Sequence, residues 1–133
     1  MIGIVIVAHG GLADTLLQAV EHVVGPLEQI CAIGLEPRDD LAARRTEIEE
    51  ASQQVNSGAG VVIVTDLFGG TPANLAIAAM AAGDIDVISG ANLPLLMKLA
   101  TSRTLPRSEA VAAAVMAGRK YILDAASVMG GAN

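Results

Sequence analysis

Aromatic residues and cysteine are almost absent from this sequence. Only 2% of its 133 residues are aromatic, although 53% are hydrophobic. A core must therefore be built from Ala, Val, Ile and Leu, which suits helices packed closely on a sheet. The single cysteine, Cys31, excludes a disulfide framework and a thiolate metal site, and it favours a reducing, cytoplasmic compartment.

Basic charge is also scarce. The 8 Lys and Arg residues stand against 14 Asp and Glu, for a net charge of −6, which argues against nucleic acid or an anionic membrane surface as a partner. The apolar start, residues 1–8, has no basic leader and is too short to span a bilayer, so we expect a buried strand and no membrane insertion. HExxH, paired-histidine and GxxxxGK[ST] motifs are missing, so we expect no metal and no nucleotide cofactor.

The length of the chain predicts one domain over residues 1–133. Short apolar runs alternate with stretches of helical periodicity. This alternation predicts an α/β fold with an open, mainly parallel sheet of four strands and helices on both faces. The expected strands are 2–8, 29–35, 60–66 and 86–90, and the expected helices are 12–24, 40–55, 71–82, 92–102 and 108–117.

Local signals mark some of these boundaries. Thr71 is the expected cap of the third helix, with Pro72 in its first position. The second helix is charged on most sides and should be the most exposed. After the turn at Gly118-Arg119, the apolar stretch 120–124 has no crossover helix before it, so it would be antiparallel if it joined a sheet. We expect the tail, 129–133, to be frayed.

Polar residues follow three of the predicted strands. The first strand leads into His9 and Gly10, the third into the segment Asp66 to Pro72, and the fourth into Gly90 to Pro94. In an open parallel sheet, ligands collect outside the carboxyl ends of the strands, where the strand order reverses. If the first and third strands are neighbours, His9 and Asp66 therefore lie side by side.

This pair suits nucleophilic chemistry. Imidazole is a nucleophile near neutral pH when one ring nitrogen keeps a free lone pair. By accepting a hydrogen bond from Nδ1–H of His9, Asp66 would leave Nε2 free. The amides of Gly69, Gly70 and Thr71, at the start of a helix, would hold the oxygens of a phosphoryl group.

Other residues have plainer interpretations. His22 lies in the middle of a helix among surface residues, and Asp14 is a first-turn acid that favours the helix dipole. Asp66 is about five residues too early to cap the third helix, so it needs another partner. Gly10 and Asn92 are candidates for the rim of the site, although Asn92 is equally suited to starting a helix.

Three segments together are typical of a known family. They are the apolar strand into His9-Gly10, the segment DLFGGTP at 66–72 followed by Ala73-Asn74, and GANLP at 90–94. The chain resembles the enzyme IIA domain of the mannose-family (fructose/mannose-type) phosphoenolpyruvate-dependent sugar phosphotransferase system (PTS). The resemblance implies that His9 accepts a phosphoryl group from phospho-HPr and passes it to a IIB protein. It also implies that Asp66 is the hydrogen-bond partner of His9, and that homodimers exchange the last strand, 120–124, antiparallel.

Alternatives remain open at this point. Sugar-uptake members are often fused to a IIB domain through an Ala/Pro-rich linker, so we expect a separate IIB protein or a regulatory partner as the acceptor. The chain would then be a transport component or a regulatory phosphoprotein. Histidine phosphatases also place His-Gly after the first strand, but they resemble an Arg-His-Gly arrangement, whereas Ala8 precedes His9 here. A related domain of dihydroxyacetone kinase systems uses an early histidine, but DLFGGTP is not expected there.

Overall fold

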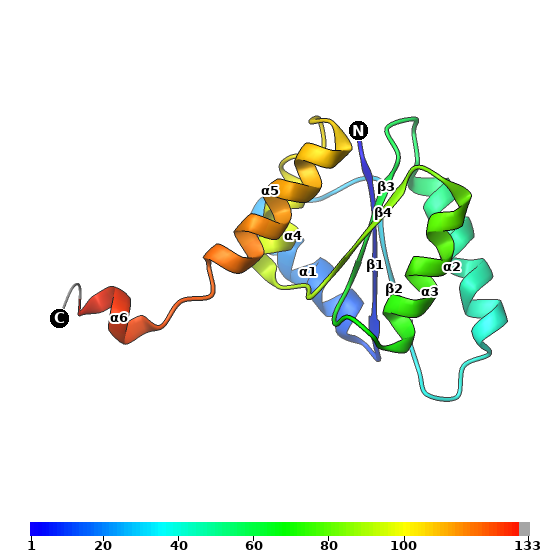
Figure 1. The fold of residues 1–133 in the computed structure, drawn as a ribbon, viewed down its shortest axis with the longest axis horizontal. Coiled ribbons are helices and arrows are strands. Elements are labelled where there is room, and N and C mark those ends of the chain that lie inside the picture. Colours follow the sequence, from blue (N-terminus) through cyan, green and yellow to red (C-terminus); the bar gives the residue numbers. More distant parts are fainter. Residues whose placement is uncertain (131–133) are drawn as a thin grey trace.

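The four predicted strands form one parallel sheet with the order β2-β1-β3-β4 (Figure 1). The structure is a computed structural model, and it describes residues 1–130. The strands run β1 Gly3–His9, β2 Ile30–Leu35, β3 Val61–Thr65 and β4 Ile85–Ser89. All four begin and end within a few residues of the predicted runs, which confirms the parallel α/β fold predicted from the sequence.

The strand order reverses between β1 and β3. From β1 the chain moves outward to β2, and it then returns to the other side of β1 to form β3 and β4. Both central strands are buried on both faces: Ile4 to Ala8 and Val61 to Thr65 are fully inaccessible to solvent. This explains why these strands read as continuous apolar runs rather than alternating ones. The carboxyl ends of β1 and β3 therefore meet at the switch point of the sheet.

Helices cover both faces of the sheet (Figure 1). On one face, α1, α4 and α5 enclose a core that includes Ile4, Ile6, Leu96 and Leu99. On the other face, α2, through Ile48, and α3 pack over Val5, Val7 and Ile63 of the sheet. The helices run α1 Leu12–Val24, α2 Leu41–Val55, α3 Thr71–Ala79 with the 3-10 turn η1 Met80–Ala82, α4 Leu93–Ala100, α5 Arg107–Lys120 and α6 Ala125–Met129.

The start of α3 differs from the prediction. Gly70, not Thr71, occupies the N-cap position, and no side chain caps the helix there. Thr71 and Pro72 both lie within the first turn. Gly70 has extended backbone angles, φ −91° and ψ 177°, so the change of direction from loop to helix takes place one residue earlier than the pattern suggested.

The predicted end of α5 at Ala117 is also wrong. Gly118 does not form a turn but lies buried inside the helix. A methyl group added to it would lie only 3.1 Å from Cβ of Leu95 in α4. Gly118 therefore allows α4 and α5 to pack closely, and α5 continues to Lys120.

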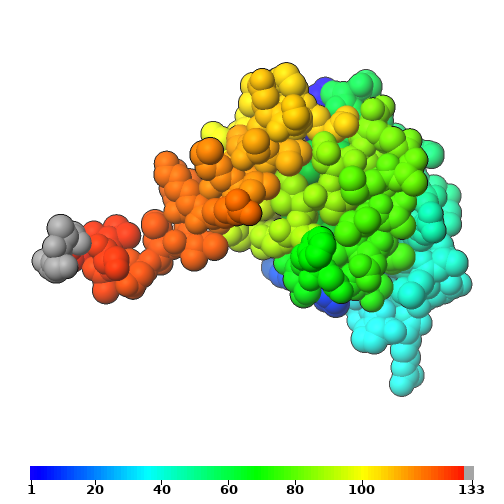
Figure 2. Space-filling model, viewed as in Figure 1, coloured from blue at the N-terminus to red at the C-terminus, as the bar shows by residue number. Residues whose placement is uncertain are grey.

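The C-terminal segment leaves the body of the protein (Figures 1 and 2). Within residues 1–130 of the single chain, 120–124 forms no strand: Lys120 ends α5, and Asp124 caps the short helix α6. Ile122, Leu123 and Met129 are 75%, 62% and 85% exposed. The exchange of a strand between two chains stays a prediction. Of the frayed tail expected at 129–133, Met129 closes α6, and 131–133 lie outside the described residues.

Among residues 1–130, no helix has both the length and the apolar character needed to cross a membrane.

Candidate functional site

His9 is the last residue of β1 and the first exposed one after a fully buried strand. Half of its side chain, 52%, is accessible to solvent. Gly10 follows with a positive φ of 56°, and its amide donates to the Leu35 carbonyl at 2.8 Å. This left-handed turn suits glycine, and it ends the strand at the point where the imidazole reaches the surface.

Asp66 directly follows β3 and contacts His9 twice. Its Oδ2 lies 2.8 Å from Nδ1 of the His9 ring and accepts the His9 amide at 3.1 Å. Its Oδ1 accepts the Leu67 amide at 3.0 Å. An ionised carboxylate can only accept hydrogen bonds, so Nδ1 carries the proton and Nε2 keeps a free lone pair. The two residues, 57 positions apart in the sequence, are thus held in the arrangement that a nucleophilic imidazole requires.

The environment of Asp66 favours its charged form. Burial alone would raise its pKa, but the hydrogen bonds from the His9 ring and amide, the nearby imidazole and the Leu67 amide together lower the pKa below its usual value. Only 10% of the Asp66 side chain is exposed. Asp66 therefore stays ionised, and available to accept from Nδ1–H, throughout the neutral range.

The glycine loop lies against the other side of the imidazole. A methyl group built on Gly70 would lie 3.3 Å from Cε1 and 3.6 Å from Nε2 of His9. Because Gly70 is the N-cap of α3, the edge of the ring that carries Nε2 faces the start of that helix. Free amides and the helix dipole favour an anion there. Gly69 makes the preceding turn with φ +91°.

A cavity of about 630 Å³ opens beside His9. Glu36 and Asp39, from the loop between β2 and α2, form its acidic side. Among the described residues, those that line it are His9, Gly10, Leu35, Glu36, Pro37, Asp39, Leu41, Thr71 and Pro72. Gly10 and Thr71, two of the predicted site residues, thus line the cavity beside His9, and its described lining contains neither Lys nor Arg.

Substitution of Gly70 by alanine is expected to slow chemistry at His9 without unfolding the protein. The φ of −91° suits any residue, but the new methyl group would press on the imidazole. Small misplacements of a reacting group are costly, so we expect a loss of roughly tenfold in the rate of the phosphoryl transfer that the resemblance implies for His9. Single-turnover labelling and a thermal melt check this.

Gly69→Ala is the matched control. Nothing lies within 4 Å of a methyl group there, but the φ of +91° disfavours any side chain. This variant should lose stability and keep a nearly normal rate. The assignment of Gly70 is wrong if the two variants behave in the opposite way.

Asn92 lies at a helix junction. Its Oδ1 accepts the Leu95 amide at 2.9 Å and so caps α4, while its Nδ2 donates to the Gly118 carbonyl at 3.0 Å. It is not among the described residues that line the cavity beside His9. The rim role proposed for Asn92 therefore has no support from these contacts, whereas the helix-start role does.

Asn92→Ala is accordingly expected to lower the free energy of unfolding by about 1–2 kcal/mol, because α4 loses its cap and Gly118 its side-chain donor. The rate of phosphoryl transfer at His9 should stay close to that of the wild type. Chemical denaturation and a labelling assay measure the two effects separately. A large loss of rate in a stable variant would restore Asn92 to the site.

Sequence reasoning missed the acidic side of the cavity and the exposed apolar side chains on the segments that carry the site. Leu41, Leu67 and Phe68 are 52%, 49% and 78% exposed, and Phe68 is the only phenylalanine in the chain. The one available signal was this single Phe inside a glycine-rich loop, where no core needs it. Glu36 and Asp39 carried no signal, because only the tertiary packing brings their loop beside β1.

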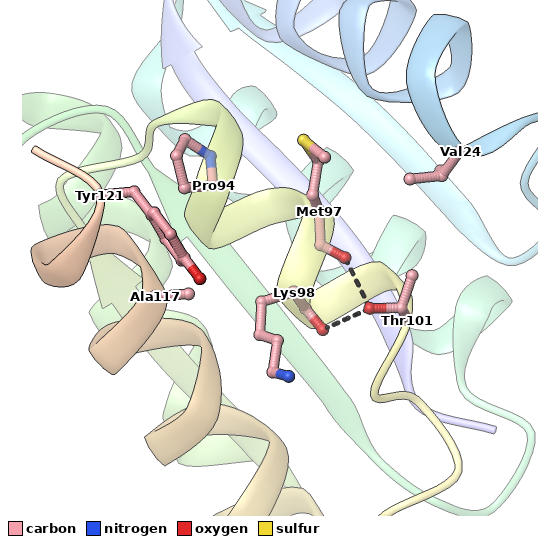
Figure 3. Close-up of a pocket in the computed structure, with 7 residues that line it drawn as sticks. All are labelled: Val24, Pro94, Met97, Lys98, Thr101, Ala117 and Tyr121. Carbon is pink, nitrogen blue, oxygen red and sulfur yellow. Dashed lines mark hydrogen bonds between the residues drawn. The ribbon is translucent and has the colours of Figure 1, made fainter. Parts of the chain in front are cut away.

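A second cavity of about 470 Å³ lies where α1, α4 and α5 meet (Figure 3). Its wall is mostly apolar, with Met97 and Pro94 from α4 and Tyr121 from the end of α5. Among residues 1–130, Lys98 is the only charged residue that lines it. His22, the other histidine, lies exposed in the last turn of α1. The nucleophile and carboxylate pair therefore points to the first cavity as the site.

Together, the fold and the site define a parallel α/β domain with a solvent-exposed histidine that a carboxylate orients beside a helix N-terminus. Residues 3–116 match the family model described as "PTS system fructose IIA component". The chain belongs to this family of PTS IIA components.

The similarity to known proteins extends over most of the chain. The chain is 32% identical over 103 residues to the sorbose-specific EIIA component of the PTS from Lacticaseibacillus casei, which covers 74% of this chain and 72% of that protein. It is 30% identical over 124 residues to the mannose-specific EIIAB component of Escherichia coli strain K12, covering 91% of this chain but only 38% of the relative. The crystal structure of an EIIA component from Streptococcus agalactiae superposes with a TM-score of 0.84 at 30% identity, covering 93% and 97% of the two chains.

Proposed function

We propose that this protein is a phosphoryl carrier that accepts a phosphoryl group from phospho-HPr on Nε2 of His9 and passes it to a IIB protein. The observation that carries the proposal is the 2.8 Å contact between Nδ1 of His9 and Oδ2 of Asp66, with the imidazole half exposed. The IIA family supports the general role.

The transfer needs no metal or cofactor in this scheme. The lone pair on Nε2 attacks phosphorus, a new N–P bond forms, and the bond from phosphorus to the donor breaks. The proton stays on Nδ1, where Asp66 stabilises the positive charge that the ring acquires. In the second transfer the acceptor attacks phosphorus, the N–P bond breaks, and His9 leaves with its lone pair restored on Nε2.

Negative charge on the phosphoryl oxygens needs stabilising. We assign this role to the amides at the start of α3 and to the hydroxyl of Thr71, which lines the cavity beside His9. Glu36 and Asp39 repel a dianion, and within residues 1–130 no Lys or Arg lines the cavity. A protein partner would therefore supply the cations that complete the transition state.

A protein rather than a small molecule is the expected donor. Leu41 lines the cavity beside the half-exposed imidazole, and Leu67 and Phe68 belong to the loop that begins at Asp66; all three are exposed apolar side chains. Large exposed apolar side chains near a functional group mark contact surfaces. We also propose a cytoplasmic location, which the single cysteine favours.

Reconstitution tests the proposal. The purified chain is mixed with enzyme I, HPr and labelled phosphoenolpyruvate, and a purified IIB protein is added in a second step. We expect one acid-labile phosphoryl group per chain, which disappears from the chain as the IIB protein gains it. An absence of label on the wild-type chain would refute the proposal.

We also propose a homodimer that exchanges the segment 120–124. The support is the unpaired outer side of β4 together with the exposed side chains of Tyr121, Ile122 and Leu123. An exchanged antiparallel strand would pair with β4 and bury these side chains.

Truncation after Arg119 is therefore expected to convert a dimer into a monomer, as measured by light scattering on a size-exclusion column. Truncation after Asp124, which keeps the proposed strand and removes α6, is the control and should stay dimeric. The oligomeric state depends on the protein concentration. A full-length chain that is still monomeric at a concentration on the order of tens of micromolar would contradict the proposal.

A further inference from the structure

A pair of hydroxyl groups lies under the site, at the carboxyl ends of β3 and β4. Thr65 and Ser89 are register partners in the parallel sheet, and their side-chain oxygens are 2.7 Å apart. Thr65 is fully buried, and the four residues before it in β3 are apolar and equally buried. A hydroxyl in such a strand costs free energy unless it is hydrogen-bonded. Valine has nearly the same shape and would fill the space equally well.

The pair also reaches the loop that carries Asp66. Oγ1 of Thr65 lies 3.4 Å from the carbonyl oxygen of Leu67, to which it donates. Either hydroxyl can be the donor in the short contact between Thr65 and Ser89, and when Thr65 donates to Leu67 the donor is Ser89. The carbonyl of Thr65 accepts the amides of Gly90 and Ala91, both at 3.0 Å. Thr65, before Asp66, is thus hydrogen-bonded directly to the end of β4. Leu67, after Asp66, is connected to it through the Thr65 hydroxyl.

We infer that Thr65 and Ser89 are positioning residues for phosphoryl transfer, because their hydroxyl pair anchors the turn that aims the Asp66 carboxylate at Nδ1 of His9. Asp66 must accept from the His9 amide, the His9 ring and the Leu67 amide at once. These three bonds require one orientation of the carboxylate, and that orientation depends on the direction in which the chain leaves β3. The inference rests on the proposed function for its kinetic consequence, but its structural part does not.

The decisive readout is the tautomer of His9. Nitrogen NMR of the imidazole distinguishes a proton fixed on Nδ1 from one that exchanges between the two nitrogens. In the wild type we expect a protonated Nδ1 and a free Nε2. In Thr65→Val, the two nitrogen signals should move toward each other, and the rate of phosphoryl transfer should fall roughly tenfold, as expected for a small misplacement of a reacting group.

Three further variants make the test specific. Thr65→Ser keeps the hydroxyl and should restore the wild-type signals and rate. Ser89→Ala removes the other member of the pair and should act in the same direction as Thr65→Val, which keeps the inference testable if Thr65→Val does not fold. Ser52→Ala is the matched control, because Ser52 is a buried serine in α2 whose hydroxyl donates to the Ile48 carbonyl at 2.8 Å. It should affect stability alone.

The outcomes separate this inference from the proposed function. If folded Thr65→Val and Ser89→Ala keep the wild-type tautomer and rate, the inference is wrong, whatever the function. If the wild type accepts no phosphoryl group, the proposed function fails, and the shift of the nitrogen signals in Thr65→Val alone decides whether the pair orients Asp66.

Discussion

Replacing His9 with alanine is expected to abolish incorporation of phosphate from phosphoenolpyruvate in the presence of enzyme I and HPr. The reason is chemical: among residues 1–130, no other histidine at this edge of the sheet has an exposed ring and a largely buried carboxylate partner. The fold should survive, because the His9 side chain is half exposed and the backbone amide that donates to Oδ2 of Asp66 is kept in the variant. Phosphate labelling followed by acid and base treatment measures the effect.

The second histidine provides the control. His22 lies exposed in the last turn of α1, so His22→Ala should label to the same extent as the wild type. Both variants should give the same circular dichroism spectrum as the parent. Normal labelling of His9→Ala, or a loss of labelling confined to His22→Ala, would show that His9 is not the acceptor.

Asp66→Asn is expected to lower the rate of phosphoryl transfer by about 10²–10⁴-fold. The carboxylate accepts on both oxygens, from His9 on Oδ2 and from the Leu67 amide on Oδ1. An asparagine has only one acceptor oxygen. Either the Leu67 amide or the His9 groups must then face an NH₂ group, and the Nδ1 proton is no longer fixed. Rapid-quench labelling measures the rate.

Asp14→Asn is a suitable control for this variant. Asp14 lies exposed in the first turn of α1, so its substitution changes the net charge of the chain by the same amount without touching His9. It should transfer at nearly the normal rate. An Asp66→Asn variant that is as fast as Asp14→Asn would show that the carboxylate does not orient the nucleophile.

The central part of the fold could be predicted because its causes are local and strong. A parallel strand with helices on both sides is buried on both faces, so β1 and β3 appear as uninterrupted runs of Val, Ile and Ala. The rule that ligands collect at the switch point then predicted that His9 and Asp66 are neighbours, although they are 57 positions apart in the sequence. No knowledge of the side-chain packing was needed for that step.

Other features depend on tertiary contacts that a sequence pattern does not reveal. Gly118 resembled a helix end, but it lies inside α5, where the absence of a side chain leaves room for Leu95 of α4. Thr71 resembled a cap, but the extended backbone of Gly70 places it in the first turn. The acidic wall of Glu36 and Asp39 depends on where the loop after β2 comes to lie. The hydroxyl pair of Thr65 and Ser89 requires the register of β3 against β4.

The most direct test of the account is the position of the phosphoryl group on the imidazole. Correlated phosphorus and nitrogen NMR of the phosphorylated wild-type chain, labelled with ¹⁵N in histidine, identifies the modified nitrogen. We predict a single phosphohistidine at His9, bonded through Nε2, with the proton on Nδ1. A phosphoryl group on Nδ1 of His9, the atom that faces Asp66, or on His22 would contradict the account.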